Sequence, residues 1–370
     1  MRALRYHGRE DLRLEEVPDP VPGPTELLVR VSATGVCGTD AAELVHGPHL
    51  YWPHDRPHPG SGHTGAVIPG HELAGVVVGV GPDVAGFAVG DAVVSGAGVW
   101  CGTCAACLAG RTNGCATYWT VGLQRDGGLA ELVAVPARTC LAIAPYGLTT
   151  DAAALAQPMA IAAHAVDRGA PQAGEDVLVI GAGGIGGFIT WAAADADARV
   201  VAVDPDAERR AQAARLGAAA TLSPRDAGAA DVTADLVLEV SGVPAGLAAA
   251  LRAVRPGGRV VLVGLHEPPS SVDLRAVALR EVTLMGTVAH RCLTDLPAAL
   301  RLLAARPGGW SDVAPVAVPL DAVIDDALRP MAEGRATRIK TLVDPWATAI
   351  RSTQMTGAAA PSASPPAPAP

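Results

Sequence analysis

The sequence Val177-Leu-Val-Ile-Gly-Ala-Gly-Gly-Ile-Gly186 is the best indicator of architecture in this chain of 370 residues. An apolar run followed directly by G-x-G-x-x-G predicts a strand, a tight turn and a helix. The first glycine permits the turn, the second lets the backbone approach a pyrophosphate, and the third lets the helix pack on the strand. The helix N-terminus offers free N–H groups to phosphates. We predict a dinucleotide-binding turn formed by Gly181, Gly183, Gly184, Ile185 and Gly186.

Further apolar runs follow this turn and alternate with Ala-rich stretches that have helical character. They are Arg199-Val-Val-Ala-Val, Ala234-Asp-Leu-Val-Leu-Glu-Val and Gly258-Arg-Val-Val-Leu-Val-Gly. Strands that are apolar throughout indicate a parallel sheet covered by helices on both faces. The fold class is therefore α/β, and we expect a doubly wound Rossmann domain that would bind the dinucleotide over residues 151–290.

An acid ends the second of these strands. Asp204 stands where a carboxylate would accept hydrogen bonds from the adenosine ribose and repel a 2′-phosphate, which favours NAD over NADP. Arg209 and Arg210 follow closely, and an arginine there can accommodate NADP, so NADP remains the alternative. A plain turn residue before Pro205 is the other interpretation of Asp204.

The region before residue 150 has a different pattern. Short Val-rich runs such as Glu26-Leu-Leu-Val-Arg-Val-Ser and Leu73-Ala-Gly-Val-Val-Val are separated by Gly and Pro, which is typical of an antiparallel β-domain. We expect residues 1–150 to form this domain and residues 291–347 to return to it. Residues 348–370 are rich in Ala and Pro, and we expect a disordered tail there.

Four cysteines lie close together, at Cys101, Cys104, Cys107 and Cys115. Their spacing allows four thiolates to surround one tetrahedral Zn²⁺, and such a closed site is structural. We assign this structural zinc to a lobe at about residues 96–118. The alternative is two disulfides, which the absence of a recognisable secretory leader disfavours. Cys140 and Cys292 are expected to be buried thiols.

Composition narrows the possible partners and location. The net charge is −9, which disfavours nucleic acid or an anionic membrane as a partner. No apolar run is long enough to cross a bilayer. We therefore expect a cytoplasmic protein that acts on a small molecule.

A second metal site is suggested by Cys37 in Gly35-Val-Cys-Gly-Thr-Asp and by His71 and Glu72 in Gly70-His-Glu-Leu-Ala-Gly. Both motifs adjoin Val-rich runs, so both could lie at strand ends. A thiolate, an imidazole and one oxygen ligand would leave an open position on zinc for a substrate oxygen. A buried cysteine beside an unrelated His-Glu pair is the alternative.

Over roughly residues 1–345 the chain resembles the zinc-containing medium-chain dehydrogenases. Gly70-His-Glu-x-x-Gly75 with Gly81 is similar to their zinc signature, and Cys37 to their first ligand. The runs Cys37-Gly-Thr-Asp, His46-Gly-Pro and His58-Pro-Gly resemble the butanediol and polyol branch, which includes sorbitol and threonine dehydrogenases. The resemblance implies a GroES-like catalytic domain, two zinc ions per subunit, and a homodimer or homotetramer. It also implies that Thr39 hydrogen-bonds the reacting oxygen and passes its proton towards the nicotinamide ribose.

At two positions this chain has a residue that differs from the one usual in the butanediol and polyol branch. Gln157 stands where the branch usually has a glutamate, and its amide oxygen could bind the catalytic zinc. Ala42 stands where relatives often carry a histidine that relays the proton to solvent. His46, His49, His54, His58 and His63 follow, and one of them could take over; otherwise they are ordinary loop residues.

Together these features predict an NAD-dependent zinc alcohol dehydrogenase. It would transfer a hydride between NAD and a secondary alcohol or ketone, such as a vicinal diol, an acyloin or a small polyol. The alternatives are a biosynthetic epimerase or lyase with a transient redox step, and a silent homologue that only binds nucleotide.

Overall fold

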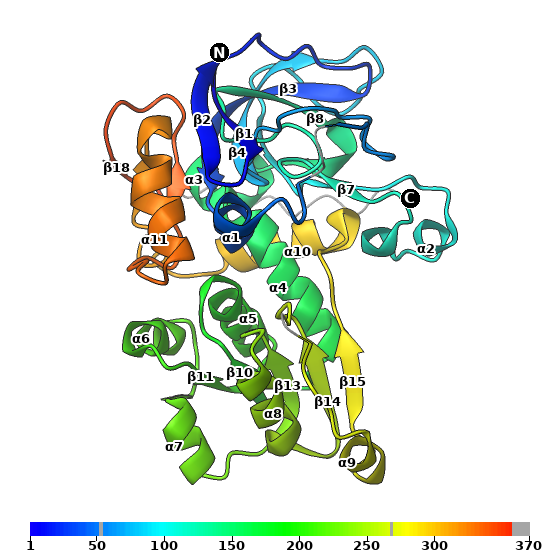
Figure 1. Ribbon diagram of the computed structural model, residues 1–370, viewed down its shortest axis with the longest axis vertical. Helices are drawn as coiled ribbons and strands as arrows, with labels where there is room; N and C mark the ends of the chain where they lie inside the picture. Colours follow the sequence, from blue (N-terminus) through cyan, green and yellow to red (C-terminus); the bar gives the residue numbers. More distant parts are fainter. Residues whose placement is uncertain (52–54, 267–268, 357–370) are drawn as a thin grey trace. The chain divides into compact units, whose positions relative to one another are not determined.

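The computed structural model describes residues 1–51, 55–266 and 269–356, and the chain divides into two compact units (Figure 1). The first unit contains Met1–Gln157 and Arg291–Pro370, and the second contains Pro158–His290. The first boundary therefore falls later than the residue 150 expected from composition. Among the described helices, none combines the length and the apolar character needed to span a bilayer.

Strands dominate the first unit, and most of their pairings are antiparallel. Two small sheets pair β1 (Arg2–Gly8) with β2 (Asp11–Glu16) and β6 (Gly98–Val99) with β7 (Trp119–Thr120). The large sheet is formed by β3 (Glu26–Gly35), β4 (Glu72–Val80), β5 (Ala92–Ser95), β8 (Leu132–Pro136), β9 (Cys140–Ala142), β16 (Val316–Val318), β17 (Leu342–Val343) and β18 (Arg351–Ser352). Its order is β18-β16-β17-β3-β4-β5-β9, and β8 also pairs with β3.

Helices in the first unit are mostly short: α1 (Gly38–His46), α2 (Ala105–Leu108), α3 (Thr150–Ala153), α10 (Cys292–Ala304) and α11 (Arg329–Ala332). Helix α4 (Ala156–Gly169) begins in this unit and continues into the second. Single 3₁₀ turns occur at Thr112–Gly114, Ala137–Thr139, Ala144–Tyr146 and Leu320–Ala322, with a π-helical turn at Ile324–Leu328.

Strand β3 shows how the core of this unit forms. Its alternate residues Leu27, Val29 and Val31 are fully buried and pack in one cluster with Leu73 and Val77 of β4. This is the alternation expected of a strand with one face in the core. The ends of β3 and β4 carry the residues of the second predicted metal site.

The C-terminal segment corrects one prediction. Residues 348–356 were expected to be disordered, but β18 pairs with β16, and Arg351 donates to both oxygens of Asp151 at 2.8 and 2.9 Å. Asp151 also accepts the N–H of Gln354, and Met355 is buried. A bidentate ion pair and a buried side chain hold this segment in place despite its composition. The predicted tail at 357–370 lies outside the described residues.

The second unit is built on a six-stranded sheet with the order β12-β11-β10-β13-β14-β15. Its strands are β10 (Asp176–Ile180), β11 (Arg199–Val203), β12 (Ala220–Leu222), β13 (Ala234–Glu239), β14 (Val254–Leu262) and β15 (Thr283–Gly286), all parallel. Its helices are α5 (Gly184–Asp195), α6 (Ala207–Arg215), α7 (Pro224–Ala229), α8 (Pro244–Ala253) and α9 (Leu274–Leu279). The predicted parallel sheet is confirmed.

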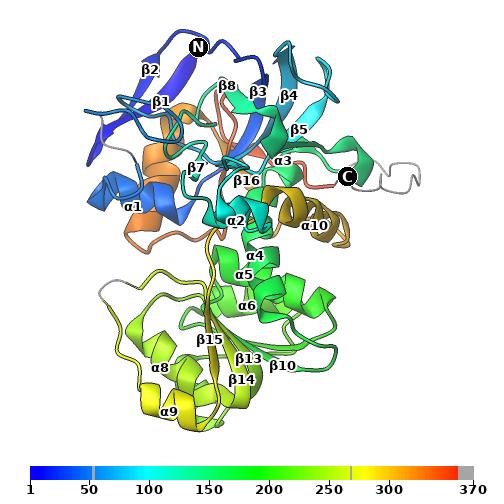
Figure 2. The ribbon, with the colours of Figure 1, turned by 90° about the vertical axis from the view of Figure 1, so that its right-hand side faces the viewer.

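Both faces of this sheet are covered, as Figure 2 shows for α5 and α8. On one face Val179 lies against Gly186 of α5, and on the other Leu178 and Val237 pack in one cluster with Ala250 of α8. The chain order runs from β10 towards β12 and then from β13 towards β15, so its direction reverses between β10 and β13. Ligands of such sheets bind at the carboxyl ends of the strands beside that reversal.

Candidate metal centres and cofactor site

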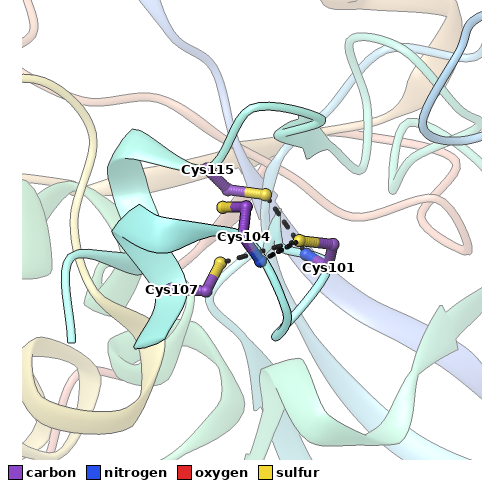
Figure 3. A group of neighbouring side chains, drawn as sticks. All are labelled: Cys101, Cys104, Cys107 and Cys115. Atoms are coloured by element: carbon purple, nitrogen blue, oxygen red, sulfur yellow. Dashed lines mark hydrogen bonds between the residues drawn. The ribbon is translucent and has the colours of Figure 1, made fainter. Parts of the chain in front are cut away.

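The four clustered cysteines converge in one loop (Figure 3). Their sulfur atoms all lie within 4.8 Å of one another, and all seven cysteines of the chain are free thiols. Helix α2 and the 3₁₀ turn at Thr112–Gly114 fold the intervening residues back, so the last cysteine reaches the first three. Four sulfur atoms that converge without forming a disulfide bond fit a tetrahedral zinc site and argue against the disulfide alternative.

Hydrogen bonds favour the thiolate form of one of these cysteines, Cys101. The hydroxyl and N–H of Thr103 and the N–H of Cys104 lower the pKa of the Cys101 thiol to about 5. Desolvation instead raises the pKa of Cys107 to about 12. Neighbouring thiolates repel each other, so a divalent cation is the natural partner that lets all four ionise.

The cysteine lobe packs on the start of α10. Trp100, Cys115 and Cys292 form one buried cluster, and the Cys292 thiol donates to the carbonyl of Gly98 at 3.3 Å. Burial raises the pKa of Cys292 to about 12, so it stays a neutral thiol. Cys292 and Cys140 are both buried, as expected from the sequence.

The second group forms where β3 and β4 meet. Gly35 and Glu72 are partners in the antiparallel register, and Cys37 and His71 flank that pair. The ligand atoms of Cys37, His71 and Glu72 all lie within 4.8 Å of one another. Gly35 leaves room for Glu72, because a Cβ there would lie 3.1 Å from Glu72 Cβ and would also overlap the carboxylate. Register, rather than sequence proximity, brings these three side chains together.

Unsatisfied atoms make this group a candidate metal site. Within the described part of the chain, His71 Nδ1, Glu72 Oε2 and Gln157 Oε1 are buried and make no hydrogen bond. Buried polar atoms nearly always have a partner, so each needs an explanation. A thiolate, an imidazole and a carboxylate form a donor set that suits zinc. Gln157, in the first turn of α4, is buried and presents an unpaired oxygen, as a fourth ligand would require.

Asp40 connects this group to its surroundings. Its carboxylate accepts the N–H of Cys37 at 3.1 Å and the Tyr51 hydroxyl at 2.9 Å, and lies 3.7 Å from His71 Nδ1. Burial lowers the pKa of His71, but the charges of Asp40 and Cys37 raise it more, to about 9. Asp40 was overlooked in the sequence, although its place three residues after Cys37 is a capping position for α1.

Lys340 is the other residue that sequence reasoning missed. It is 4% exposed, and its Nζ pairs with Glu72 Oε1 and donates to the carbonyl of Val36 at 3.3 Å. Burial alone lowers the pKa of an ammonium, but the charges of Glu72 and Cys37 raise the pKa of Lys340. One signal was available, because Lys340 is the single lysine of the chain.

Thr39 and the histidines complete the predicted site. Thr39 Oγ1 lies 3.7 Å from Cys37 Sγ, in the first turn of α1. His58 Nδ1 accepts the N–H groups of Gly60 and Ser61 at 3.1 Å, so this ring fastens a local turn. His46 and His49 are exposed, as is Ala42, and His63 is half-buried. His54 lies outside the described residues.

The glycine-rich turn has the predicted form. Gly181 follows β10 with a φ of +96°, and Gly183 is the N-cap of α5 with no side-chain cap. A Cβ on Gly186 would lie 1.8 Å from the carbonyl oxygen of Gly181. Gly183, Gly184 and Ile185 are partly exposed, so the N–H groups of this helix terminus can meet a phosphate.

Asp204 lies at the carboxyl end of β11, as predicted. It is buried, and its carboxylate accepts the N–H of Ala182 at 2.8 Å and of Asp206 at 2.9 Å. Arg209 lies beside the turn, its guanidinium 3.8 Å from where a Cβ on Gly183 would be. Arg210 instead donates to the carbonyls of Asp204 and Pro205. The turn therefore has one acid and one arginine next to it.

Comparison with known families gives two matches. Residues 23–145 match the alcohol dehydrogenase GroES-like domain, and residues 184–305 match the zinc-binding dehydrogenases. The first match contains Cys37, the His-Glu motif and the cysteine lobe. The second begins at Gly184, within the glycine-rich turn.

Individual proteins are similar over most of the chain. The chain is 34% identical to an L-threonine 3-dehydrogenase of Saccharopolyspora erythraea over 305 residues, which cover 77% of this chain and 83% of that protein. The fold is similar to that of 2R,3R-butanediol dehydrogenase from Bacillus subtilis, with a TM-score of 0.85 and 29% identity over 93% of this chain and 99% of that one. It also resembles a zinc-binding dehydrogenase from Sinorhizobium meliloti bound to NADP, with a TM-score of 0.81 and 29% identity over 93% and 99%.

Proposed function

This chain belongs to the zinc-containing medium-chain dehydrogenases, and on that premise we propose that it oxidises a secondary alcohol with NAD and reduces the ketone in the reverse direction. Membership makes it an oxidoreductase that depends on zinc and a nicotinamide nucleotide. Two observations carry the proposal: the ligand atoms of Cys37, His71 and Glu72 lie within 4.8 Å of one another, and Glu72 Oε2 is buried with no hydrogen-bond partner among the described residues.

Separate residues hold the two metal ions in this proposal. Cys37, His71 and Glu72 would bind the catalytic zinc, with Gln157 as the fourth candidate. Cys101, Cys104, Cys107 and Cys115 would bind the structural zinc. When bound, the catalytic zinc supplies a Lewis acid and the nicotinamide supplies a hydride acceptor.

The proton of the alcohol needs its own path. The Thr39 hydroxyl lies 3.7 Å from the sulfur of the proposed ligand Cys37, and we assign it the role of accepting and returning this proton. Asp40 fixes the start of α1 through the N–H of Cys37 and so holds both residues in place. With Ala42 in place of a histidine, the remaining route to solvent runs through ordered water or one of the histidines after residue 45.

The substrate is proposed to be a vicinal diol, an acyloin or a small polyol. The printed names of two similar proteins support this, because threonine and 2,3-butanediol are both secondary alcohols with a second polar group on the adjacent carbon. A related amino alcohol therefore belongs in the substrate class to be tested.

For the cofactor we propose NAD, held by Gly181, Gly183, Gly184, Ile185, Gly186, Asp204 and Arg209. Asp204 supports this because its buried carboxylate would repel a 2′-phosphate on the adenosine ribose. Arg209 beside the turn supports NADP as the second choice. A homodimer or homotetramer and a cytoplasmic location also remain predictions, and light scattering tests the first.

The deciding experiment measures NAD⁺ reduction and metal content on the same sample. The panel contains vicinal diols, acyloins, sugar alcohols, cyclitols and L-threonine, with the matching primary alcohols as controls. The proposal predicts net NADH formation with secondary alcohols that have a polar neighbour. Substrate conversion without net NADH would indicate a transient redox step, and NAD binding without any turnover would indicate a silent homologue.

A further inference from the structure

Glu239 is a fully buried carboxylate in the second unit, outside both metal groups. It is the last residue of β13 and has 0% exposure. Oε1 accepts the N–H of Ser241 at 3.0 Å and also the Ser241 hydroxyl. Oε2 accepts the N–H of Gly242 at 3.3 Å and lies 2.9 Å from His266 Nε2. A buried charge is tolerated only with such partners, and here they come from two loops.

The first loop follows β13 and lies against the glycine-rich turn. A Cβ on Gly181 would lie 3.0 Å from the nitrogen and 3.1 Å from the Cα of Ser241. The N–H of Val240 donates to the carbonyl of Ile180, the residue before that turn, at 2.9 Å. The loop after β13 therefore lies directly beside Gly181, the first glycine of the motif, and is hydrogen-bonded to the residue before it.

The second loop follows β14. Its N–H groups at Val263 and Gly264 donate to the backbone carbonyl of Glu239 at 2.8 and 3.0 Å. Because a carboxylate only accepts, His266 Nε2 carries the hydrogen, and Nδ1 can accept from Ser270 Oγ at 3.2 Å. The side chain and carbonyl of Glu239 together fasten this loop to the one after β13.

We propose that Glu239 is a positioning residue for the dinucleotide: by holding Ser241 and His266, it sets the shape of the cofactor cradle at the carboxyl ends of β10, β13 and β14. Glu239 is in register with Ile180 and Leu262, so all three strands end at the same level. A dinucleotide occupies both halves of such a sheet, with its pyrophosphate at the glycine-rich turn. This inference rests on the proposed function, because it concerns the same NAD site.

If Glu239 only stabilised the fold, its loss would lower the melting temperature without a selective effect on cofactor binding. Glu175 provides the matched control for this alternative. Glu175 lies just before β10 and pairs with Arg259 of β14, so it joins the same sheet at its amino ends, away from the cofactor. Glu175→Ala should lower the melting temperature but leave cofactor binding unchanged. Glu239→Ala should affect both.

The experiment titrates the purified enzyme with NADH by fluorescence and measures KM for NAD⁺, KM for the alcohol and kcat. In Glu239→Ala we expect the Kd for NADH and the KM for NAD⁺ to rise about tenfold, because Ser241, Gly242 and His266 lose their shared acceptor, while KM for the alcohol stays unchanged. Glu239→Gln keeps an oxygen acceptor for Ser241 and should stay within about threefold of the parent. Ser241→Ala removes only the hydroxyl and should raise Kd less than Glu239→Ala does.

Two results would overturn the inference. One is a Kd for NADH within about twofold of the parent in both Glu239→Ala and Ser241→Ala. If Glu239→Ala does not fold, a Kd within about twofold of the parent in Ser241→Ala decides against the inference. The other is an equal loss of affinity in Glu175→Ala. A parent enzyme that binds no NADH would instead refute the proposed function, so the two failures are distinct.

Discussion

Lys340 and Glu72, 268 positions apart in the sequence, form a buried ion pair beside the Cys37–His71–Glu72 group. Lys340 occupies one carboxylate oxygen of Glu72 and leaves the other without a partner among the described residues. The single lysine of the chain thus balances a carboxylate that is proposed to face a metal ion.

Removing this cation should be costly. In Lys340→Met, Glu72 keeps its charge without the buried partner, and we expect the free energy of unfolding to fall by about 3–5 kcal/mol. Denaturant unfolding after zinc has been removed with a chelator measures this change, because no metal ion then compensates the charge of Glu72. The double variant Lys340→Met/Glu72→Gln should be more stable than Lys340→Met, because the uncompensated charge is gone. A free energy of unfolding for Lys340→Met within about 1 kcal/mol of the parent would show that the ion pair contributes little to stability.

Gln157 can be tested through metal retention. If its buried amide oxygen binds the catalytic zinc, Gln157→Glu adds a negative charge to the ligand set and should slow zinc loss to a chelator about tenfold. Gln157→Ala should accelerate the loss. Unchanged zinc release in both variants would place Gln157 outside the ligand set.

Asp204 should control the choice between the two nucleotides. Asp204→Asn keeps an oxygen to accept from Ala182 or Asp206 but removes the charge that would repel a 2′-phosphate. We expect the ratio of kcat/KM for NAD⁺ over NADP⁺ to fall about tenfold or more. Arg209→Ala should lower kcat/KM for NADP⁺ in the same assay. An unchanged ratio in Asp204→Asn would remove the basis for preferring NAD.

Glu26 should contribute to acid sensitivity. Burial raises the pKa of its carboxyl, but the Arg125 guanidinium and the N–H of Gly23 lower it more, to below the ordinary 4.5. A carboxyl with a lower pKa in the folded state stabilises the protein above pH 4.5 and loses that contribution as the pH falls through the folded value. Glu26→Gln should therefore lower the melting temperature most near neutral pH, and the difference should shrink in acid. The exposed Glu16→Gln serves as the control, and a pH-independent difference for Glu26→Gln would contradict this assignment.

Local patterns were sufficient to predict much of this molecule. The strand, turn and helix around Gly181 require only neighbouring residues, and the four lobe cysteines lie within one short loop. Cys37 and His71 could be connected because each adjoins a Val-rich strand, although only the register of β3 and β4 shows that their ligand atoms meet.

Long-range contacts could not be predicted in this way. Nothing near Glu72 in the sequence indicates Lys340, and nothing near Asp151 indicates that Arg351 will hold the C-terminal segment in place. The composition of residues 348–356 predicted disorder because composition contains no information about such partners. The link from Glu239 to Gly181 through Ser241 likewise depends on two strands that are distant in sequence but adjacent in the sheet.

The central claim is that Cys37 holds a catalytic zinc ion, and zinc content measured together with turnover tests it most directly. We predict two zinc ions per subunit in the parent. Cys37→Ser should retain one zinc and lose turnover with little change in melting temperature. Cys107→Ser should also retain one zinc, but its melting temperature should fall because the lobe packed on α10 loses its metal. Full turnover in Cys37→Ser, with its zinc content unchanged, would contradict the account.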